Sequence, residues 1–456
     1  MKLDKKISII GTGFIGLVSA ACFAKKGFET YASSMSEEKI DIINQGDPPF
    51  FEDSLAELLK EAVGSGMLKG VFGREKAILN SDVSFLCVGT PMREDKSADL
   101  RFIEESSRAI GEALAKKDSY HLIVDRSTIV PGTTRNKIVK NLEASSGKKA
   151  GLDFGVCMNP EFLREGESIY DTLNPDRIVI GEYDERSGDE LEALYRDFFA
   201  DREEGCPPIM RTNLETAEVV KYANNCFLAT KISFANEFSN LCETIPGVDI
   251  YDIMKAVGMD FRINSKFLRA GVGWGGSCFP KDVNAMVQFF KKQGLAPRIL
   301  QATLEANAHQ AKRIVAIAKQ ESGGTLSGKR VALLGLTFKP HTDDMREAPS
   351  IYITEYLLTE KAKIVGYDPI ATPFGTGTAV RYFEQNIEYA SSVSEALTDA
   401  DCTLILTDWP EFEELASTDF EVMSNPIVID GRRHLSPSLE GIKYRGIGFG
   451  NNLSSS

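Results

Sequence analysis

The chain has 456 residues, which is too long for one ordinary hydrophobic core, so two or three domains are expected. Its 43% hydrophobic and 26% charged residues are typical of a soluble globular protein. A formal net charge of −14 argues against a nucleic-acid-binding surface, and no apolar run has the length of a membrane span. No signal-peptide pattern opens the chain, so we expect a cytoplasmic protein without nucleic-acid or membrane partners.

The eight cysteines are scattered, without a CxxC pair or a histidine at zinc-ligand spacing. Without a secretion signal they are predicted to be reduced thiols, most of them buried. The four histidines form no metal or nucleophile cluster either, so neither a bound metal nor a histidine base is expected.

Short apolar runs alternate with helical patterns along residues 1–211, which predicts a parallel, doubly wound, Rossmann-like α/β domain. The expected strands are residues 7–10, 30–33, 83–88, 122–125, 155–158 and 177–180.

A helical texture starts near Thr212. Thr212 and Glu215 fit a capping box, and the chain from there to about Glu243 is amphipathic and free of proline. Helices continue to about residue 320, where Gly323 and Gly324 end the last one. Residues 212–322 are therefore expected to form a helical central domain with a long connecting helix.

Alternating strands and helices return after Gly328, with strands expected at residues 330–334, 363–367, 403–406 and 427–429. The segment KRVALLGLTFKP loosely resembles the N-terminal KKISIIGTGFIG but lacks GxGxxG. Residues 323–456 are therefore predicted to form a second Rossmann-like domain, which binds something other than a dinucleotide.

The first expected strand leads into Gly11-Thr12-Gly13-Phe14-Ile15-Gly16, a dinucleotide-binding pattern. The first glycine permits a tight turn, the second lets a pyrophosphate approach the backbone, and the third lets helix and strand pack closely. The following helix then directs its N-terminus at the phosphates. The strand before the motif and the helix after it favour a bound dinucleotide over a glycine turn without a ligand.

The end of the second expected strand, about 18 residues past Gly16, normally carries an acid for the ribose hydroxyls. Ser34 occupies this place, and the acids come only at Glu37 and Glu38. Without that carboxylate the NADP 2′-phosphate is rejected less strongly, and Lys39 could attract it. We expect NAD as cofactor, with Ser34 hydrogen-bonded to its ribose and NADP tolerated.

Residues 271–282 read GVGWGGSCFPKD, in which a flexible glycine loop presents Cys278 just before a proline. Proline suits the first turn of a helix, and a helical pattern runs over residues 282–292. A thiol at a helix N-terminus beside lysines is stabilised as a nucleophilic thiolate. The sequence therefore predicts a nucleophile at Cys278 rather than a buried structural cysteine.

With these motifs the chain resembles the UDP-glucose/GDP-mannose dehydrogenase family over nearly its whole length. The matching segments, in the family's order, are GTGFIGL (11–17), CVGTP (87–91), RSTIVPGTT (126–134), NPEFLREG (159–166), KYANNCFLATKISFANE (221–237), GVGWGGSCFPKD (271–282) and GLTFKPHTDDMREAPS (335–350). The form GGSCFPKD is similar to the UDP-glucose branch. The GDP-mannose branch typically has leucine after the cysteine, and the N-acetylhexosamine branch has histidine before it.

The resemblance implies an NAD-dependent four-electron oxidation of UDP-glucose at C6 to UDP-glucuronate, with two NAD per substrate. The first oxidation gives an aldehyde that the Cys278 thiolate attacks. The thiohemiacetal then loses a second hydride and becomes a thioester, which water hydrolyses. The same chemistry on GDP-mannose or a UDP-N-acetylhexosamine stays open, as does a non-catalytic sugar-nucleotide sensor. An epimerase is disfavoured, because such enzymes typically use a Tyr-x-x-x-Lys pair and need no cysteine.

Catalytic roles follow from the same resemblance. Lys221 and Asn225, four residues apart on one helix face, match oxyanion-stabilising positions. Asp282 matches a carboxylate that orients a catalytic water or the lysine. Glu161 matches the general base for the hydrolytic water, and Thr128 would position that water. A further acid in the same motif, Glu165, is either close to this water or only a helix-start charge.

Binding positions complete what the resemblance and the glycine motif imply. The cofactor positions are Gly11, Gly13, Phe14, Ile15, Gly16, Ser34, Lys39, Gly89, Thr90, Pro91, Thr128, Glu165 and Arg346. The UDP-sugar positions are Phe162, Leu163, Arg164, Lys221, Asn225, Arg262, Phe267, Arg269, Gly275, Lys339 and Arg432. Arginine suits bidentate phosphate contacts, and Arg262 would reach a pyrophosphate across a homodimer formed through the central helices.

Overall fold

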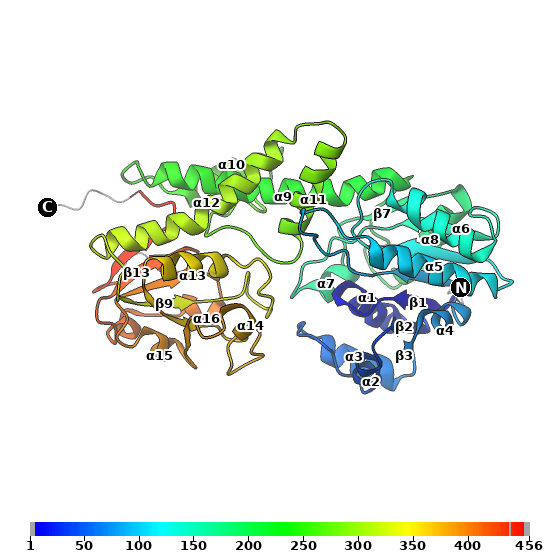
Figure 1. The fold of residues 1–456 in the computed structure, drawn as a ribbon, viewed down its shortest axis with the longest axis horizontal. Coiled ribbons are helices and arrows are strands. Elements are labelled where there is room, and N and C mark those ends of the chain that lie inside the picture. The colour runs from blue at the N-terminus through cyan, green and yellow to red at the C-terminus, as the bar shows by residue number, and fades with distance from the viewer. Residues whose placement is uncertain (1–4, 437–438, 451–456) are drawn as a thin grey trace. The chain divides into compact units, whose positions relative to one another are not determined.

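The computed structural model describes residues 5–436 and 439–450, and the chain divides into two compact units, residues 1–224 and 225–456. Both units contain a sheet with helices around it, as Figure 1 shows, which confirms the predicted α/β class. The boundary between the units falls inside one helix, α9 (Leu214–Cys242).

The sheet of the first unit has the strand order β3-β2-β1-β4-β5-β6-β7-β8. Its strands are β1 (Ile7–Ile10), β2 (Thr30–Ser34), β3 (Leu68–Phe72), β4 (Val83–Leu86), β5 (His121–Asp125), β6 (Phe154–Met158), β7 (Ile178–Glu182) and β8 (Ile209–Asn213). All six predicted strands are present, and β3 and β8 are additional. Both additional strands lie at the edges of the sheet.

The predicted all-parallel arrangement is wrong at one place, because β7 pairs antiparallel with β6. The helix between them, α7 (Ser168–Leu173), has 6 residues and is therefore only about 9 Å long. It is too short to return the chain along a five-residue strand of about 17 Å. The chain therefore enters β7 from the edge at which it left β6.

Helices cover both faces of this sheet. One apolar core lies beneath α1 (Phe14–Lys25), α3 (Leu55–Gly64), α7 and α8 (Glu185–Phe198). The other lies beneath α4 (Arg74–Leu79), α5 (Arg101–Ala115), the π-helical segment η1 (Thr134–Val139) and α6 (Lys140–Ser146). Helix α2 (Glu37–Asn44) follows β2 directly. The unit is doubly wound, as predicted.

Helix α9 begins one residue later than the capping box predicts. Thr212 belongs to β8, and the first turn is capped by Asn213, whose Oδ1 accepts a hydrogen bond from the Thr216 N–H at 2.8 Å. Asparagine serves as well as threonine at an N-cap, and here the strand already uses the threonine.

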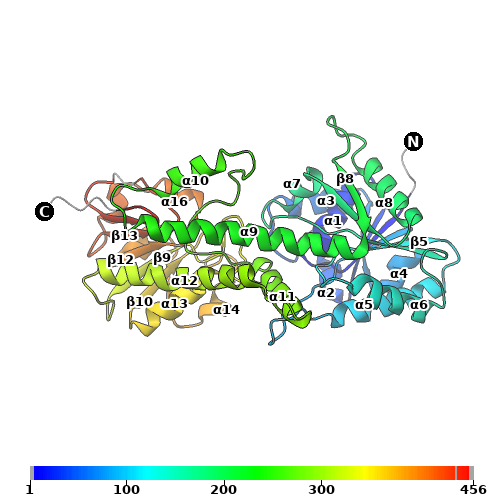
Figure 2. The same cartoon turned by 90° about the horizontal axis from the view of Figure 1, so that it is seen from above.

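The second unit continues with α10 (Ile250–Gly258), α11 (Phe279–Lys292) and α12 (Arg298–Glu321). Helix α12 lies alongside the C-terminal part of α9 (Figure 2), where the hydroxyls of Thr230 and Thr303 are 3.0 Å apart. Gly323 and Gly324 both have positive φ and end α12, as predicted. Within the described part of the chain, no helix is both long enough and apolar enough to cross a bilayer.

A six-stranded parallel sheet with the order β11-β10-β9-β12-β13-β14 forms the rest of this unit. Its strands are β9 (Arg330–Leu334), β10 (Lys363–Tyr367), β11 (Glu388–Tyr389), β12 (Cys402–Ile405), β13 (Ile427–Asp430) and β14 (Lys443–Gly446). The helices α13 (Pro349–Thr359), α14 (Val380–Phe383), α15 (Val393–Leu397) and α16 (Pro410–Glu413) and the 3-10 turn η2 (Ser417–Phe420) connect them. The predicted second Rossmann-like sheet is confirmed, with the edge strands β11 and β14 in addition.

Asp368, directly after β10, occupies the place where a dinucleotide-binding domain carries its ribose-binding acid. Its Oδ2 accepts hydrogen bonds from the Leu336 and Thr337 N–H groups, the Thr337 hydroxyl and the Trp409 indole at 2.8–3.1 Å. Its Oδ1 accepts from the N–H groups of residues 370 and 371, each at 3.0 Å. Both oxygens therefore hold together the unit's own turns.

Candidate active site

The glycine turn after β1 has the shape that a dinucleotide needs. Gly11 has φ +108°, and a Cβ there would lie 2.7 Å from the Cys87 carbonyl oxygen. A Cβ on Gly16 would lie 1.9 Å from the Gly11 carbonyl oxygen, so only glycine lets α1 approach β1 this closely. A Cβ on Gly13 would meet nothing within 4 Å. This open side, at the N-terminus of α1, leaves room for a pyrophosphate.

The other expected cofactor positions of this unit follow the C-terminal ends of its strands. Ser34 is the last residue of β2, and its Oγ accepts the Ser36 N–H at 3.1 Å. Lys39 is exposed in the first turn of α2. After β4 and β5, the Thr90 hydroxyl donates to the Thr128 carbonyl at 2.6 Å, which joins two of the predicted loops. Phe14 and Ile15 are half-buried, whereas Gly89 and Pro91 are exposed.

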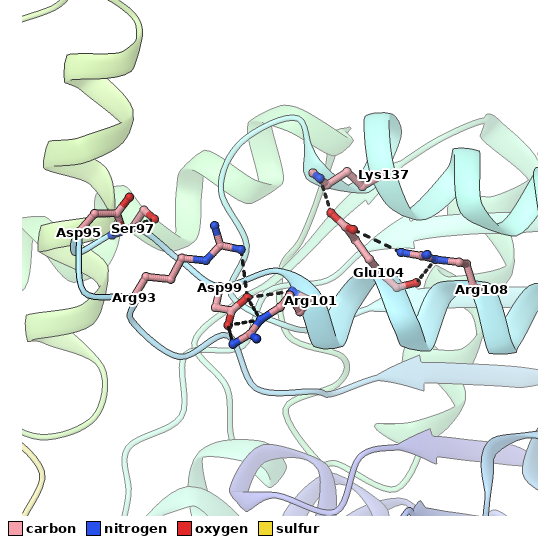
Figure 3. Close-up of polar contacts among 8 residues, drawn as sticks. All are labelled: Arg93, Asp95, Ser97, Asp99, Arg101, Glu104, Arg108 and Lys137. Carbon is pink, nitrogen blue, oxygen red and sulfur yellow. Dashed lines mark hydrogen bonds and ion pairs between the residues drawn. The ribbon is translucent and has the colours of Figure 1, made fainter.

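The loop after Pro91 is fixed by one buried carboxylate (Figure 3). Asp99 accepts hydrogen bonds from Arg93 at 3.2 Å and from the Arg101 guanidinium at 2.6–3.1 Å. Farther along α5, Glu104 pairs with Arg108 and with Lys137 of η1. The loop between β4 and α5 is therefore anchored at the start of its helix.

Glu161 and Lys221 form a buried ion pair. The Lys221 Nζ lies 2.8 Å from the Glu161 Oε1, and the two side chains are only 4% and 6% exposed. The Leu163 N–H donates to the Glu161 Oε2 at 2.7 Å. Burial opposes ionisation of Glu161, but the ammonium of Lys221 and this N–H lower its pKa. Glu161 is therefore a carboxylate at neutral pH, and the structure brings together two residues that lie 60 positions apart.

The predicted sugar-binding residues beside Glu161 differ in their surroundings. The Phe162 ring lies 5.7 Å from the Lys221 Nζ, and Leu163 is half-buried. Arg164 instead forms a two-pronged contact with Asp171, at 3.0 and 2.7 Å, which raises its pKa. An acid already engages this guanidinium within its own unit. Glu165 is half-buried in the same loop.

Two fully buried carboxyls in this unit, at 0% exposure, were not predicted from the sequence. Glu218, one turn before Lys221 on α9, accepts hydrogen bonds from the N–H groups of Gly132 and Thr134 and from the Thr134 hydroxyl. Asp125, at the end of β5, has its pKa raised well above the ordinary value by burial. Burial also raises the pKa of Glu218. The signal for Asp125 in the sequence was a lone acid at the end of an expected strand. The signal for Glu218 was its position three residues before Lys221 on the expected helix.

In the second unit, Cys278 is the N-cap residue of α11, and Pro280 stands in the first turn, as predicted. One turn later Asp282 is 1% exposed, and its carboxylate accepts from the Asn225 side chain at 2.6 Å and from Lys281 at 2.5 Å. Two residues that were predicted separately, Asn225 and Asp282, are thus joined directly. Lys281, expected to support the thiolate, is paired with Asp282.

The glycine loop before Cys278 is buried from Gly271 to Gly276, so the expectation of a flexible loop is wrong. A Cβ on Gly275 would lie 2.1 Å from the Glu347 carbonyl oxygen, and one on Gly276 would lie 2.7 Å from the Phe338 ring. The glycines serve close packing against the segment after β9.

Side chains of α9 and α12 form hydrogen bonds with the backbone of this loop, and these contacts were not predicted from the sequence. Asn307 bonds both backbone groups of Trp274, accepting its N–H at 2.8 Å and donating to its carbonyl at 2.9 Å. The Asn236 side chain accepts the Gly271 N–H at 2.8 Å, and Gln310 donates to the Gly271 carbonyl at 3.1 Å. The backbone leading to the cysteine is therefore held in one conformation.

Two of the predicted UDP-binding arginines meet in this unit. The Arg269 guanidinium donates to Asp408 at 2.9 Å and to the Arg432 carbonyl at 3.0 Å. Burial lowers the pKa of the Arg432 guanidinium, which donates to the Leu406 carbonyl at 2.7 Å. Phe267 has a left-handed φ of +63°, which is strained for a bulky residue. Such strain is typical of functional sites.

Three other predicted residues of this unit have partners of their own. Arg262 is paired with Asp260 and Arg346 with Asp344, at 2.5 and 2.8 Å. The Lys339 Nζ lies 5.7 Å from the Phe338 ring centroid. Each of these residues has an intramolecular contact.

All eight cysteines lie among the described residues and are free thiols, and Cys278 alone is exposed. Burial raises the pKa of each of the other seven, for example to about 12 at Cys22 and Cys87. The prediction that most of the cysteines are buried and that one of them is set apart is confirmed.

Comparison with known families gives three matches along the chain, all to domains of one family. The NAD binding domain of the UDP-glucose/GDP-mannose dehydrogenase family matches residues 5–199. The central domain of that family matches residues 215–309, and its UDP binding domain matches residues 332–437.

Individual relatives are similar over nearly their full length. A UDP-glucose 6-dehydrogenase of Haloferax volcanii is 41% identical over 97% of this chain and 100% of the relative. A GDP-mannose 6-dehydrogenase of Pseudomonas aeruginosa is 37% identical over 92% of this chain and 91% of the relative. A solved UDP-glucose dehydrogenase from the archaeon Pyrobaculum islandicum superposes with a TM-score of 0.88, at 35% identity over 98% of both chains.

Proposed function

The chain belongs to the UDP-glucose/GDP-mannose dehydrogenase family, and from this membership we propose that it oxidises UDP-glucose at C6 to UDP-glucuronate, with two NAD per substrate. The observation that carries the proposal is the setting of Cys278. It is the one exposed cysteine among the eight, and it lies at the N-terminus of α11. Asp282 follows one turn later in this helix and accepts a hydrogen bond from the Asn225 side chain.

The glycine turn after β1 would hold NAD, which would supply the hydride acceptor for each oxidation. The first oxidation converts the C6 alcohol to an aldehyde, as a hydride leaves C6 and the hydroxyl proton is released to solvent. The positive end of α11 favours the thiolate of Cys278, which adds to the aldehyde carbon and forms a carbon–sulfur bond. The Lys221 ammonium and the Asn225 amide stabilise the resulting oxyanion. Loss of a second hydride from the thiohemiacetal carbon leaves a thioester on Cys278.

Hydrolysis then needs a base that is ionised at neutral pH. Glu161 meets this condition because Lys221 lowers its pKa despite burial. Its carboxylate takes a proton from the water that attacks the thioester carbon, while Thr128 orients that water. The carbon–sulfur bond breaks, the acid leaves, and Cys278 returns to its thiolate.

UDP-glucose is the proposed substrate because serine precedes Cys278 and phenylalanine follows it, as in the UDP-glucose branch. The test is to supply the purified chain with UDP-glucose, GDP-mannose and a UDP-N-acetylhexosamine, each with NAD, and to measure NADH and product. We expect two NADH and one UDP-glucuronate per UDP-glucose, with little free aldehyde. Preference for another sugar would make the substrate assignment wrong. No NADH with any sugar would favour the sensor.

We further propose a homodimer through α9. Four large side chains on this helix are exposed at helical spacing: Phe227 (64%), Phe234 (48%), Phe238 (37%) and Leu241 (52%). Such a stripe is favourable only when covered, and a second copy presents the same stripe. Phe234→Glu should shift the sedimentation coefficient to that of a monomer. Phe374→Glu, which changes a phenylalanine outside α9 that is 64% exposed, should not. A wild-type chain that sediments as a monomer would contradict the proposal.

The domain division 1–211, 212–322 and 323–456 also remains a proposal, as does a cytoplasmic location. Eight free thiols suit a reducing compartment. Limited proteolysis with mass spectrometry of the fragments tests the boundary at residue 322, since cleavage should concentrate in the glycine turn between α12 and β9.

A further inference from the structure

We propose that Glu218 is a positioning residue that holds the loop carrying Thr128 against the helix that carries Lys221. The inference rests on the proposed function, because only that chemistry gives Thr128 and Lys221 their tasks. Glu218 is fully buried, belongs to none of the predicted catalytic or binding positions, and lies within the same unit as both residues.

The Glu218 carboxylate accepts three hydrogen bonds from one short stretch of chain, residues 132–134. Its Oε1 accepts the Thr134 N–H and the Thr134 hydroxyl, each at 2.7 Å, and its Oε2 accepts the Gly132 N–H. Thr134 begins η1, so two of these donors are N–H groups at the start of a helical segment, which lack partners within it. A buried N–H without an acceptor is costly, so this stretch stays on Glu218.

The other end of the loop is fixed to the sheet. The Ser127 N–H donates to Asp125 at 3.1 Å, and the Ser127 hydroxyl donates to the Leu86 carbonyl at 3.2 Å. Thr128 lies between these contacts and those of Glu218, and its own carbonyl accepts the Thr90 hydroxyl. Removing Glu218 therefore frees one end of the segment that sets the position of Thr128.

Helix α9 connects this loop to the base of the reaction. Glu218 and Lys221 stand three residues apart and hence on one helix face. Lys221 contacts Glu161 in the loop after β6, while Glu218 contacts the loop after β5. One turn of α9 thus sets the spacing between the residue that orients the water and the residue that takes its proton.

The experiment compares Glu218→Gln with Glu215→Gln in the full-length chain. Glu215 lies one turn earlier on α9 and also contacts η1, through Arg135 at 2.6 Å, but its side chain is 39% exposed and it binds no loop backbone. The amide introduced by Glu218→Gln would direct its own N–H groups at a backbone N–H of the loop. We expect Glu218→Gln to lower kcat about 10- to 100-fold, with KM for UDP-glucose and NAD changed less than about threefold. Glu215→Gln should keep kcat within about twofold.

A double-mutant cycle shows whether Glu218 acts through Thr128. In a Thr128→Val background, Glu218→Gln should lower kcat by less than about threefold further, because the group it positions is already gone. If Glu218→Gln does not fold, Thr134→Val removes one of its donors, and kcat should fall in the same way on a smaller scale.

The outcomes separate this inference from the function on which it rests. A wild-type chain that makes no UDP-glucuronate would contradict the proposed function. An active wild type with Glu218→Gln as active as Glu215→Gln, or with fully additive losses in the cycle, would overturn the positioning role. A lower melting temperature with unchanged kcat would likewise reduce Glu218 to a structural residue.

Discussion

Replacing Glu161 with glutamine should separate the stabilising and chemical parts of the buried ion pair. The substitution keeps the side-chain size and an oxygen for the Leu163 N–H, but it leaves the Lys221 ammonium, 4% exposed, without its counter-charge. Removing one partner of a buried pair costs about 3–5 kcal/mol. For a unit of 224 residues this corresponds to a melting temperature lower by roughly 6 to 20 °C.

The matched control is Glu75→Gln, which breaks an exposed ion pair in the same unit. Glu75 and Lys116 are 2.7 Å apart, but their side chains are 54% and 56% exposed. Solvent screens such a pair, so its loss should cost less than about 1 kcal/mol. Scanning calorimetry of both variants measures the difference. Equal melting temperatures for the two variants would refute the argument from burial.

The stabilisation depends on pH with a definite sign. Because the pKa of Glu161 is lower in the folded chain, its contribution is complete above the unfolded-state value of about 4.3 and is lost as pH falls through the lower folded-state value. The gap in melting temperature between wild type and Glu161→Gln should therefore narrow below about pH 4.

Glu161→Gln should also change the time course of the reaction. Both hydrides leave before the thioester is hydrolysed, so rapid mixing should show a burst of two NADH per active site. A steady rate about 100-fold or more below wild type should follow. A steady state without a burst would place Glu161 in an earlier step.

Three further predictions concern other parts of the chain. Cys278→Ser should abolish acid formation, measured by chromatography of the product, because a serine adduct cannot replace the thioester route; near-normal UDP-glucuronate would contradict the mechanism. Ser34→Asp should lower KM for NAD roughly fivefold and raise KM for NADP roughly fivefold, because each change in binding free energy is about 1 kcal/mol. Unchanged kcat/KM values for both cofactors would show that Ser34 does not contact the ribose. Gly275→Ala should strongly reduce activity and the labelling of Cys278 by iodoacetamide, because the new Cβ would lie 2.1 Å from the Glu347 carbonyl oxygen. Gly64→Ala, where a Cβ meets nothing within 4 Å, should match wild type. Equal activity and labelling of the two variants would mean that the loop can shift.

The sequence predicted the central strands of both sheets but not their edges. Strands β1, β9 and β10 have the expected limits because each is a short apolar run buried between helices. Strand β3 reads LKGVF and has two exposed positions, and β8 has no buried residue. Such strands are specified by pairing with a neighbour rather than by their own hydrophobic pattern.

The catalytic candidates were found through motifs, whereas their contacts depend on tertiary structure. The four-residue spacing of Lys221 and Asn225 was visible in the sequence, but the pairing of Lys221 with Glu161 was not. The glycines before Cys278 illustrate the opposite error. Composition alone suggests freedom of motion, whereas the backbone is locked by close neighbours that no local pattern reveals.

The saturation of Asp368 by the unit's own turns bears on the order of events during turnover. The acid that could have served a second dinucleotide is committed to internal hydrogen bonds. Of the two GxGxxG patterns in the sequence, residues 11–16 and 271–276, only the first directly follows a strand. Under the proposed stoichiometry, both NAD molecules must then bind one after the other at the same site. The half-oxidised sugar has to wait while spent NADH leaves and fresh NAD enters. A covalent bond to Cys278 prevents this intermediate from dissociating during the exchange. The thiol would therefore retain the intermediate between the two oxidations as well as act as the nucleophile.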